Sequence, residues 1–371
     1  MVYLDHNSTT PLSSRAKQAM LGLAHQPLNP SSIHGQGRNA KFILEEARSS
    51  ILESFGFEQN YNLLFTSSGT EANNLVMKNF YAAEILISAI EHLSIYAHQK
   101  YNPAVKIIKV DRYGLLDLEH LESLLQSASP KALISVMYVN NETGVIQNLH
   151  DVISIAKNFQ ALVHSDFSQV PGKINFQHAK GYDLDFITIS GHKFGGPLGC
   201  AGLFYKKNLQ LAPEIIGGGQ EKGLRSGTEN VFGAVGLAAA AQEVAPVAAG
   251  LEHLAYVKSL RDSLEQNLIS YCPDAQIVSK DAARVCNTSM IMMPNVASVA
   301  QLVQFDLKGF AVSSGSACSS GKVDTSHVLL AMSYTLEQAN NAIRISLSRH
   351  NTAYEIDAFC QTWKEIHDKY N

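Results

Sequence analysis

Lys193 lies between a histidine and a pair of glycines in "SGHKFGGP" (190–197), directly after the apolar run "DFITI". A lysine that follows a strand expected to be buried needs a partner for its ammonium group. Two further polar features follow other apolar runs: Asp166 comes after "ALVHS", and "FTSSGTEANNL" (65–75) reads as a strand, a turn at Gly69 and a helix start. Each has an ordinary interpretation as a surface charge or a helix cap. It is their joint occurrence that indicates a site.

The three features together match the chemical needs of pyridoxal phosphate. Its aldehyde condenses with a lysine amine, for which Lys193 is the candidate. Its phosphate needs hydrogen-bond donors, which the backbone N–H groups at a helix start supply, and Gly69 lets them come close. Its ring nitrogen stays protonated beside a carboxylate such as Asp166, and a protonated ring withdraws electrons from an attached carbanion. The sequence therefore predicts a pyridoxal-phosphate site.

Three more side chains follow strands in the same part of the chain. His92 comes soon after "EILISA", and its imidazole could stack on a flat ring and carry protons, although a lone histidine is more often a surface or core residue. Asn141 and Gln169 offer amides that could contact the phenolic oxygen of the ring, although amides are also common turn residues. Because ligands of an open α/β sheet gather beyond the carboxyl ends of its strands, we expect these side chains to meet there.

Cys318 and Arg344 lie in the last third of the chain. Cys318 is in "SSGSACSSG" (313–321), whose small and polar composition predicts an accessible loop and a nucleophilic thiol. Arg344 interrupts the apolar run "AIRISLS"; it is either one end of a surface salt bridge or, in a cleft, a planar fork for a substrate carboxylate. The remaining cysteines lie in more apolar or helical surroundings and are predicted to be structural: Cys200, Cys272, Cys286 and Cys360.

Short apolar runs alternate with helical patterns from about residue 60 onward, which predicts how these residues are positioned. The alternation is typical of an α/β fold with a mostly parallel sheet, and helical patterns lie over 70–81, 117–127 and 149–159. The runs "DFITIS" and "AGLFY" are too close together for a crossover helix between them, so these two strands are predicted to be antiparallel. The runs predicted as strands are "NLLFT", "EILISA", "VKIIKV", "ALISVMYV", "ALVHS", "DFITIS" and "AGLFY".

The pattern changes after about residue 250, where a long helix leads into short strands and a C-terminal helix around 352–369. No internal repeat or low-complexity linker marks the change. We predict a large cofactor-binding α/β domain over residues 13–250. Residues 1–12 and 251–371 are predicted to form a smaller α+β domain that carries Cys318.

Composition and charge exclude several classes of protein. The 371 residues are 46% hydrophobic, with a net charge of −4 and no basic run, so direct nucleic-acid binding is not expected. The most apolar stretch, "VFGAVGLAAAA", is too short to span a membrane, and the N-terminus has no signal-peptide pattern. Five scattered cysteines without a CxxC pair predict neither a metal site nor a disulfide framework, which favours a cytoplasmic setting.

A series of motifs along nearly the whole chain resembles the cysteine desulfurases, the NifS/IscS-like branch of the fold-type I (class V aminotransferase-like) pyridoxal-phosphate enzymes. The resemblance implies a large domain with a mostly parallel seven-stranded sheet, a smaller α+β domain and a homodimer. It also implies that L-cysteine becomes L-alanine while its sulfur is held as a persulfide and then passes to an acceptor, an iron–sulfur scaffold or a tRNA-thiolation protein. The motifs are "YLDHNSTTP", "NPSSIHGQGR", "FTSSGTEANN", "EH", "VNNETGVIQ", "HSDFSQVPGK", "SGHKFGGPLG", "GGGQEKGLRSGTEN", "GSACSS" and "IRISLSR".

The resemblance also implies a role for each candidate residue. Lys193 binds the cofactor covalently and acts in catalysis together with His92, which stacks on the ring. Cys318 attacks the substrate sulfur, and Arg344 binds the substrate carboxylate. Thr228, in "RSGT", reaches the phosphate in the neighbouring subunit. The other cofactor contacts are Gly69, Thr70, Ser190 and His192 at the phosphate, and Asn141, Asp166 and Gln169 at the ring.

Some residues depart from the commoner family pattern without removing a group that the chemistry needs. "DFSQ" places Phe167 and Ser168 where small residues are usual, and "HKFGGP" has Gly195 where a tyrosine is frequent. The opening "DHNSTT" also differs from the usual motif. Two other functions stay open at this point: a selenocysteine lyase or another lyase on the same scaffold, and a non-catalytic relative that serves as a partner protein.

Overall fold

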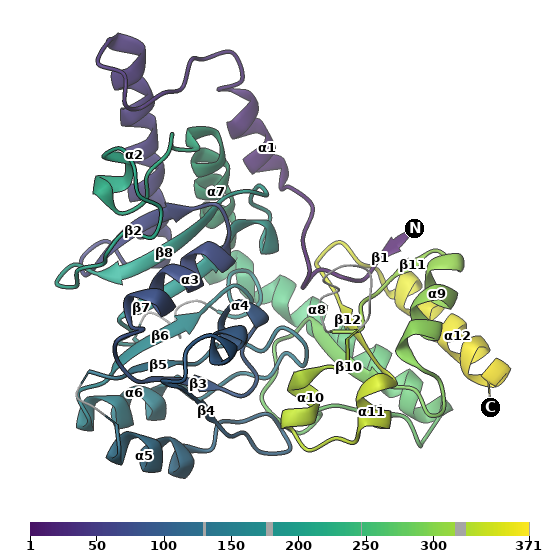
Figure 1. The fold of residues 1–371 in the computed structure, drawn as a ribbon. Coiled ribbons are helices and arrows are strands. Elements are labelled where there is room, and N and C mark those ends of the chain that lie inside the picture. Colours follow the sequence, from purple (N-terminus) through teal and green to yellow (C-terminus); the bar gives the residue numbers. More distant parts are fainter. Residues whose placement is uncertain (129–130, 176–180, 246, 316–323, 371) are drawn as a thin grey trace.

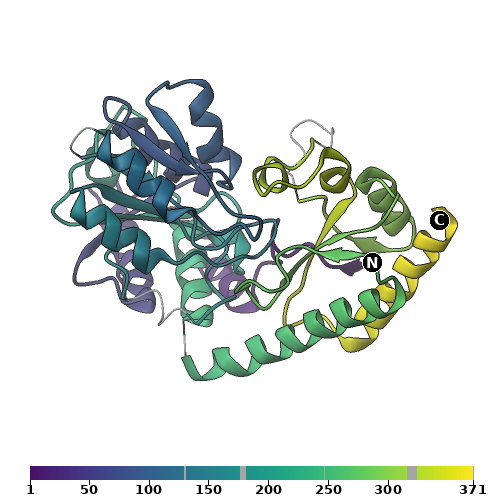
Figure 2. The same ribbon diagram turned by 90° about the horizontal axis from the view of Figure 1, so that it is seen from below.

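The computed structural model describes residues 1–128, 131–175, 181–245, 247–315 and 324–370. Figures 1 and 2 show a larger lobe built on the central sheet and a smaller lobe that holds both chain termini. The predicted α/β fold with a mostly parallel seven-stranded sheet is confirmed. The domain boundaries that the sequence suggests, 13–250 against 1–12 and 251–371, stay a prediction.

The central sheet has seven strands in the order β2-β8-β7-β6-β5-β3-β4. Strand β8 runs antiparallel to its neighbours β7 and β2, and the other pairs are parallel, so the predicted antiparallel step is confirmed. The strands are β2 (Tyr61–Thr66), β3 (Ile85–Ser88), β4 (Val105–Ile108), β5 (Leu133–Ser135), β6 (Leu162–Asp166), β7 (Phe186–Ser190) and β8 (Ala201–Lys206).

One strand is shorter than the sequence suggests. The apolar run 132–139 predicts a strand throughout, but ladder pairing covers only Leu133–Ser135. β3 ends at Ser88, and the backbone N–H of Met137 donates to the Glu91 carboxyl group at 2.7 Å instead of to a strand. The segment therefore leaves the ladder on one side and leads towards the site described below.

Helices cover both faces of the sheet, which explains why its strands are apolar on both sides. One hydrophobic core lies under α1 (Ser14–Leu21), α2 (Gly35–Phe55), α5 (Leu118–Gln126), α6 (Leu149–Asn158) and α7 (Val231–Val244). The core on the other face lies under α3 (Gly69–Asn79) and α4 (Leu93–Tyr96). The three helical patterns predicted from the sequence correspond to α3, α5 and α6 to within two residues.

The smaller lobe has its own hydrophobic core, in which Phe305, Phe359 and Trp363 are fully buried. Helices α8 (Val247–Tyr271) and α12 (Ala353–Tyr370) lie side by side beneath it (Figure 2). The N-terminal strand β1 (Val2–Tyr3) pairs with β11 (Phe310–Ala311), so the first residues of the chain belong to this lobe. Its other elements are β9 (Gln276–Ile277), β10 (Thr288–Met292), α9 (Ser298–Leu307), α10 (His327–Ala331), α11 (Leu336–Asn340) and β12 (Ala342–Ser346).

The most apolar stretch of the sequence forms most of α7, whose side chains pack against the first core. No helix within the described ranges is long and apolar enough to cross a membrane.

Candidate active site

A cavity of about 270 Å³ is lined by residues at or just after the carboxyl ends of β2, β6 and β7 and by residues of the smaller lobe. Thr228 does not line this cavity and is exposed. Cys318 lies outside the described residues, and Ser313 and Gly315, which precede it in the chain, line the cavity. The structure brings together all the other predicted site residues: Gly69, Thr70, His92, Asn141, Asp166, Gln169, Ser190, His192, Lys193 and Arg344.

Lys193 ends a short 3₁₀ turn (Gly191–Lys193) that follows β7 directly. The turn is tight because the N–H groups of Phe194 and Gly196 both donate to the carbonyl of Gly191, at 3.1 and 2.9 Å. Burial lowers the pKa of the Lys193 ammonium group below its ordinary value, and the nearby Asp166 carboxylate acts in the opposite direction. The lysine is therefore held at a strand end and is a stronger proton donor than a lysine in water.

Gly191 is required for this turn. A Cβ atom at this position would lie 2.8 Å from the backbone oxygen of Cys200 and 2.8 Å from Cδ1 of Leu237, closer than real Cβ contacts. We expect Gly191→Ala to lower the free energy of unfolding by about 2–4 kcal/mol, measured by urea denaturation. The matched control is Gly181→Ala, where a Cβ meets nothing within 4 Å, and it is expected to change stability by less than about 0.5 kcal/mol. Equal stability of the two variants would contradict this packing argument.

Asp166 is a buried carboxylate with fixed hydrogen-bond partners. Its Oδ1 accepts from the backbone N–H of Ser168 at 2.8 Å, and its Oδ2 accepts from the Asn73 amide at 2.9 Å. Burial by itself would raise the pKa of Asp166, but the hydrogen bonds from Ser168 and Asn73 outweigh it and hold the pKa below its ordinary value. The group is therefore an anion at neutral pH, as a partner for a protonated ring nitrogen must be.

Sequence reasoning missed the role of Asn73. It lies in the quoted stretch 65–75, four residues after Gly69, so on a helix it faces the same side as the expected anion site. Its amide also donates to the hydroxyl of Ser94 at 2.9 Å, which links α3 to α4 beside the cavity. The helical spacing was the signal that could have found it.

His92 is the N-cap residue of α4. Its Nδ1 lies 2.8 Å from the Ser94 hydroxyl and accepts from the Ser94 backbone N–H at 3.1 Å, which fixes the orientation of the ring. Burial, together with the charge of Lys193, lowers the pKa of His92 to about 4. The imidazole is therefore neutral at pH 7, and it can take up a proton during a reaction without carrying one beforehand.

The phosphate-binding prediction rests on the start of α3. Gly69 and Thr70 are its first residues, and the first N–H groups of a helix have no acceptor within the helix. A Cβ on Gly69 would contact the Ser168 hydroxyl and the Ser190 Cβ, each at 3.4 Å, so a larger side chain would fill the space that a ligand needs. His192 lines the same cavity, and its Nδ1 lies 3.1 Å from the Thr9 hydroxyl.

Arg344 is buried on β12 and is held by the N-terminal segment. Its Nη2 donates to the Asp5 carboxylate at 2.7 Å and to the Ser8 hydroxyl at 2.8 Å, while Nη1 donates to the backbone oxygen of Asn141 at 2.9 Å. Its Nε has no partner among the described residues. Sequence reasoning assigned residues 1–12 to the same domain as Arg344, but it did not identify Asp5 and Ser8 as the hydrogen-bond partners of Arg344.

Asn141 also presents an unused polar atom. Its Oδ1 is buried and has no hydrogen-bond partner in the described part of the chain. An unpaired buried carbonyl oxygen costs free energy unless a ligand satisfies it. The atom therefore indicates that the cavity is built to hold a polar molecule.

Residues 2–359 match the family described as aminotransferase class-V. The chain belongs to this family. A class-V relative, a cysteine desulfurase from Cereibacter sphaeroides, is 39% identical over 99% of this chain and 96% of its own length. The cysteine desulfurase NifS from Azotobacter vinelandii is 34% identical over 96% of this chain and 90% of its own length. A solved NifS-like protein from Rickettsia africae has a TM-score of 0.91 and 45% identity over 99% of each chain.

Pyridoxal phosphate is the cofactor of these class-V enzymes, and the residues of the cavity fit it. The structure offers a lysine amine at Lys193, a carboxylate held ionised at Asp166 and a helix N-terminus at Gly69. The unpaired Asn141 oxygen and the space in front of Gly69 show where a ligand is needed. The lysine amine, the carboxylate and the helix N-terminus are the three contacts that the sequence predicts for the cofactor.

Proposed function

We propose that this chain converts L-cysteine to L-alanine and holds the sulfur on Cys318 before an acceptor takes it. The chain is a pyridoxal-phosphate-dependent cysteine desulfurase, since cysteine desulfurases match it over nearly their whole length. The observation that carries the assignment of residues is the single cavity that Lys193, Asp166, His92 and Arg344 all line.

The cofactor, when bound, supplies an electron sink for the negative charge that develops on the substrate Cα. The chain supplies the groups that bind the substrate and move its protons. Arg344 binds the substrate carboxylate through its guanidinium group, which Asp5 and Ser8 hold in place. The Lys193 amine removes the Cα proton. Its lowered pKa favours the unprotonated amine, which is the form that can act as a base. The neutral His92 imidazole takes up a proton within the cavity.

Cys318 is the proposed nucleophile. Overall, its thiol and L-cysteine give a persulfide on Cys318 and L-alanine: an S–S bond forms, the C–S bond of the substrate breaks, and the carbon receives a proton. Burial raises the pKa of Cys200 and of Cys360 to about 12 and that of Cys286 to about 11, so these thiols resist ionisation. Cys272 is buried beside His367 in the smaller lobe, where its Sγ lies 3.4 Å from Nε2 of the histidine.

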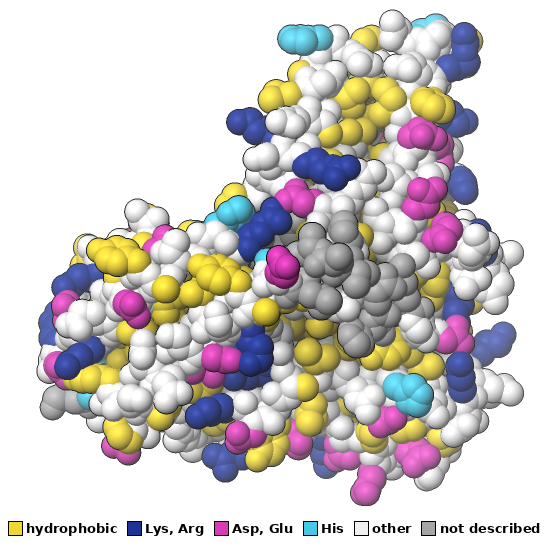
Figure 3. All heavy atoms as spheres, turned by 180° about the vertical axis from the view of Figure 1, so that it is seen from behind, with side chains coloured by type: hydrophobic (Ala, Val, Ile, Leu, Met, Phe, Trp, Pro, Cys, Tyr) yellow, Lys and Arg dark blue, Asp and Glu magenta, His cyan; other side chains and the backbone are white. Residues whose placement is uncertain are grey.

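We also propose that the enzyme is a homodimer in which Thr228 completes the phosphate site of the partner subunit. Thr228 is exposed and lies away from the cavity of its own chain, which agrees with a role in a second chain. The arm formed by α1, α2 and their connection projects from the larger lobe, and Figure 3 shows hydrophobic side chains gathered on it. Leu21, Ile33 and Phe42 of this arm are 59, 91 and 63% exposed. An exposed apolar surface of this kind is typical of an interface.

The acceptor of the sulfur is proposed to be a protein of iron–sulfur assembly or of tRNA thiolation, and the reaction is placed in the cytoplasm. The absence of a CxxC pair or a disulfide framework from the sequence supports a reducing location. We propose no direct binding of the enzyme to a membrane or to nucleic acid.

A competition experiment separates the proposed activity from a selenocysteine lyase on the same scaffold. Purified enzyme receives L-cysteine, L-selenocysteine or both, and alanine is quantified together with sulfur or selenium on the protein. We expect alanine from L-cysteine in amounts equal to the sulfur transferred, because a thiol nucleophile accepts sulfur directly. Alanine formed from L-selenocysteine alone, with no turnover of L-cysteine, would show that the enzyme is a lyase for the selenium compound.

A further inference from the structure

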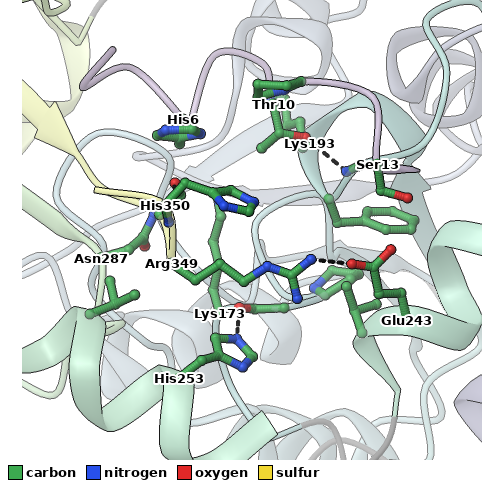
Figure 4. A pocket seen from close by; sticks show the side chains of 18 of the residues that line it. His6, Thr10, Ser13, Lys173, Lys193, Glu243, His253, Asn287, Arg349 and His350 are labelled. Carbon is green, nitrogen blue, oxygen red and sulfur yellow. Dashed lines mark hydrogen bonds and ion pairs between the residues drawn. The ribbon is translucent and has the colours of Figure 1, made fainter. Parts of the chain in front are cut away.

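Lys173 is a buried lysine to which the proposed reaction gives no role. It is 7% exposed and lines a second cavity, of about 330 Å³, which Lys193 also lines (Figure 4). Burial lowers the pKa of its ammonium group well below the ordinary value, and the charge of Lys193 acts in the same direction. A lysine buried in this way destabilises the fold unless its N–H groups find acceptors. Its partners therefore indicate what the residue does.

The Nζ of Lys173 donates to two side-chain amides, at Oδ1 of Asn7 (2.8 Å) and at Oε1 of Gln169. Gln169 is 2% exposed, and its Nε2 donates to the backbone oxygen of Asn7 at 3.0 Å. If the Gln169 amide turned by 180°, its N–H groups would face the N–H groups of Lys173, and its oxygen would face a carbonyl. Both contacts would be repulsive, so the orientation of the amide is fixed at both ends.

Gln169 also lines the site cavity, and this fixed orientation decides which atom it can present there. An amide nitrogen carries two N–H donors, of which the Asn7 carbonyl uses one. The second N–H group remains for a ligand, while the oxygen is directed at the Lys173 amine, from which it accepts a hydrogen bond. Gln169 is therefore a hydrogen-bond donor towards the cavity.

Asn7 holds Lys173 from the other side. It is 2% exposed, and its Oδ1 accepts from the Asn287 amide at 3.1 Å as well as from Lys173. Its Nδ2 donates to the Thr288 hydroxyl at 2.9 Å and to the backbone oxygen of Asn141 at 3.2 Å. Residues of both lobes thus fix the position of Asn7, and Asn7 in turn fixes the position of the Lys173 amine.

We propose that Lys173, held by Asn7, is a positioning residue that fixes the Gln169 amide with its N–H donor towards the ring oxygen of the cofactor. This inference rests on the proposed function, in which Gln169 contacts the ring. A donor at that oxygen favours the form of the bound cofactor with more negative charge on the oxygen, which is the deprotonated form. Without the fixed donor, the cofactor keeps its proton to higher pH.

The test is a pH titration of the visible absorption of the cofactor-loaded protein. We expect Lys173→Met to raise the midpoint of the spectral change by about one pH unit, because a hydrogen bond to a charged oxygen is lost. Gln169→Ala is expected to raise it by a similar amount, and the double variant by no more than Gln169→Ala alone, because both changes remove one interaction. Lys206→Met is the matched control: Lys206 pairs with Asp183 and Asp185 away from the cavity, and the midpoint should stay unchanged.

The outcomes separate this inference from the proposed role of Gln169. An unchanged midpoint in Gln169→Ala overturns both. A shift in Gln169→Ala without one in folded Lys173→Met, or shifts that add in the double variant, overturns the inference alone. Neutron diffraction from deuterated crystals of the loaded wild type tests the same point if Lys173→Met does not fold. Deuterium on the Gln169 atom beside the Asn7 carbonyl supports the inference, and deuterium on the atom beside Lys173 overturns it.

Discussion

Replacing Lys193 with alanine should lower the rate of alanine formation from L-cysteine by at least about 10⁴-fold. The substitution removes the amine that we propose both as the covalent attachment of the cofactor and as the base for the Cα proton, and no other lysine lines the site cavity among the described residues. The native visible absorption should be lost as well, because it depends on the covalent bond to the lysine. Both effects are measured on the same purified protein, by alanine quantification and by absorption spectroscopy.

The control for Lys193→Ala is Lys206→Ala. Lys206 lies at the end of β8 with its ammonium group 2.7 Å from Asp183 and 2.9 Å from Asp185, and it does not line the site cavity. This variant should keep the wild-type spectrum and rate. A Lys193→Ala enzyme that retained wild-type activity would contradict the assignment of the covalent lysine.

Cys318→Ser should lower alanine formation by about 10³-fold or more, because a hydroxyl is a far poorer nucleophile towards sulfur than a thiolate. Cys318 is not among the residues proposed to contact the cofactor, so the variant should bind pyridoxal phosphate and show the wild-type spectrum. It should also bind L-cysteine, which is measured as a spectral change on addition of the substrate. Wild-type turnover by Cys318→Ser would show that another residue accepts the sulfur.

Four single replacements serve as controls for Cys318→Ser. Cys200 and Cys272 are buried, and Cys286 and Cys360 are partly buried, so each is changed to alanine to avoid placing a hydroxyl in an apolar site. Each should keep most of the wild-type rate per folded protein. Loss of activity in one of them with intact folding and cofactor spectrum would move the nucleophile to that position.

The fold could be predicted from the sequence because most of its strands are short apolar runs that alternate with helical patterns. The runs around Leu64, Ile87, Ile134, Val163 and Ile189 each lie in a strand of the central sheet. The end of β5 was not predictable in the same way. The Met137 N–H donates to the side chain of Glu91 instead of to a neighbouring strand. A pattern of hydrophobic residues cannot reveal a side-chain acceptor of this kind.

The site was predictable where its residues follow strands, and it was not where distant segments meet. Asp166 and Lys193 end or follow neighbouring strands, so sheet topology alone brings them to the same edge. Asp5, which holds Arg344, comes from a different part of the chain and pairs with it across 339 positions of sequence. Long-range contacts of this kind depend on how the N-terminal segment packs against β12 within the smaller lobe.

The orientation of the Gln169 amide could not be predicted from the sequence either. The sequence identifies an amide near the ring, but whether it presents a donor or an acceptor depends on Lys173 and on the Asn7 carbonyl. Lys173 follows Gln169 by only four residues, so the two were visible as near neighbours in the chain, joined by a turn at Pro171 and Gly172. The role of Asn7 was not, because it enters from the N-terminal segment.

Peptide mass spectrometry after brief exposure of the wild-type enzyme to L-cysteine tests most directly whether this site delivers sulfur to Cys318. The enzyme is alkylated without reduction and digested, and the peptide that contains "GSACSS" is compared with the peptides of the other four cysteines. We expect one added sulfur atom on the Cys318 peptide, in an amount equal to the alanine formed in the first turnover, and none in Lys193→Ala. Added sulfur on another cysteine, or alanine formed with no sulfur on Cys318, would contradict the assignment.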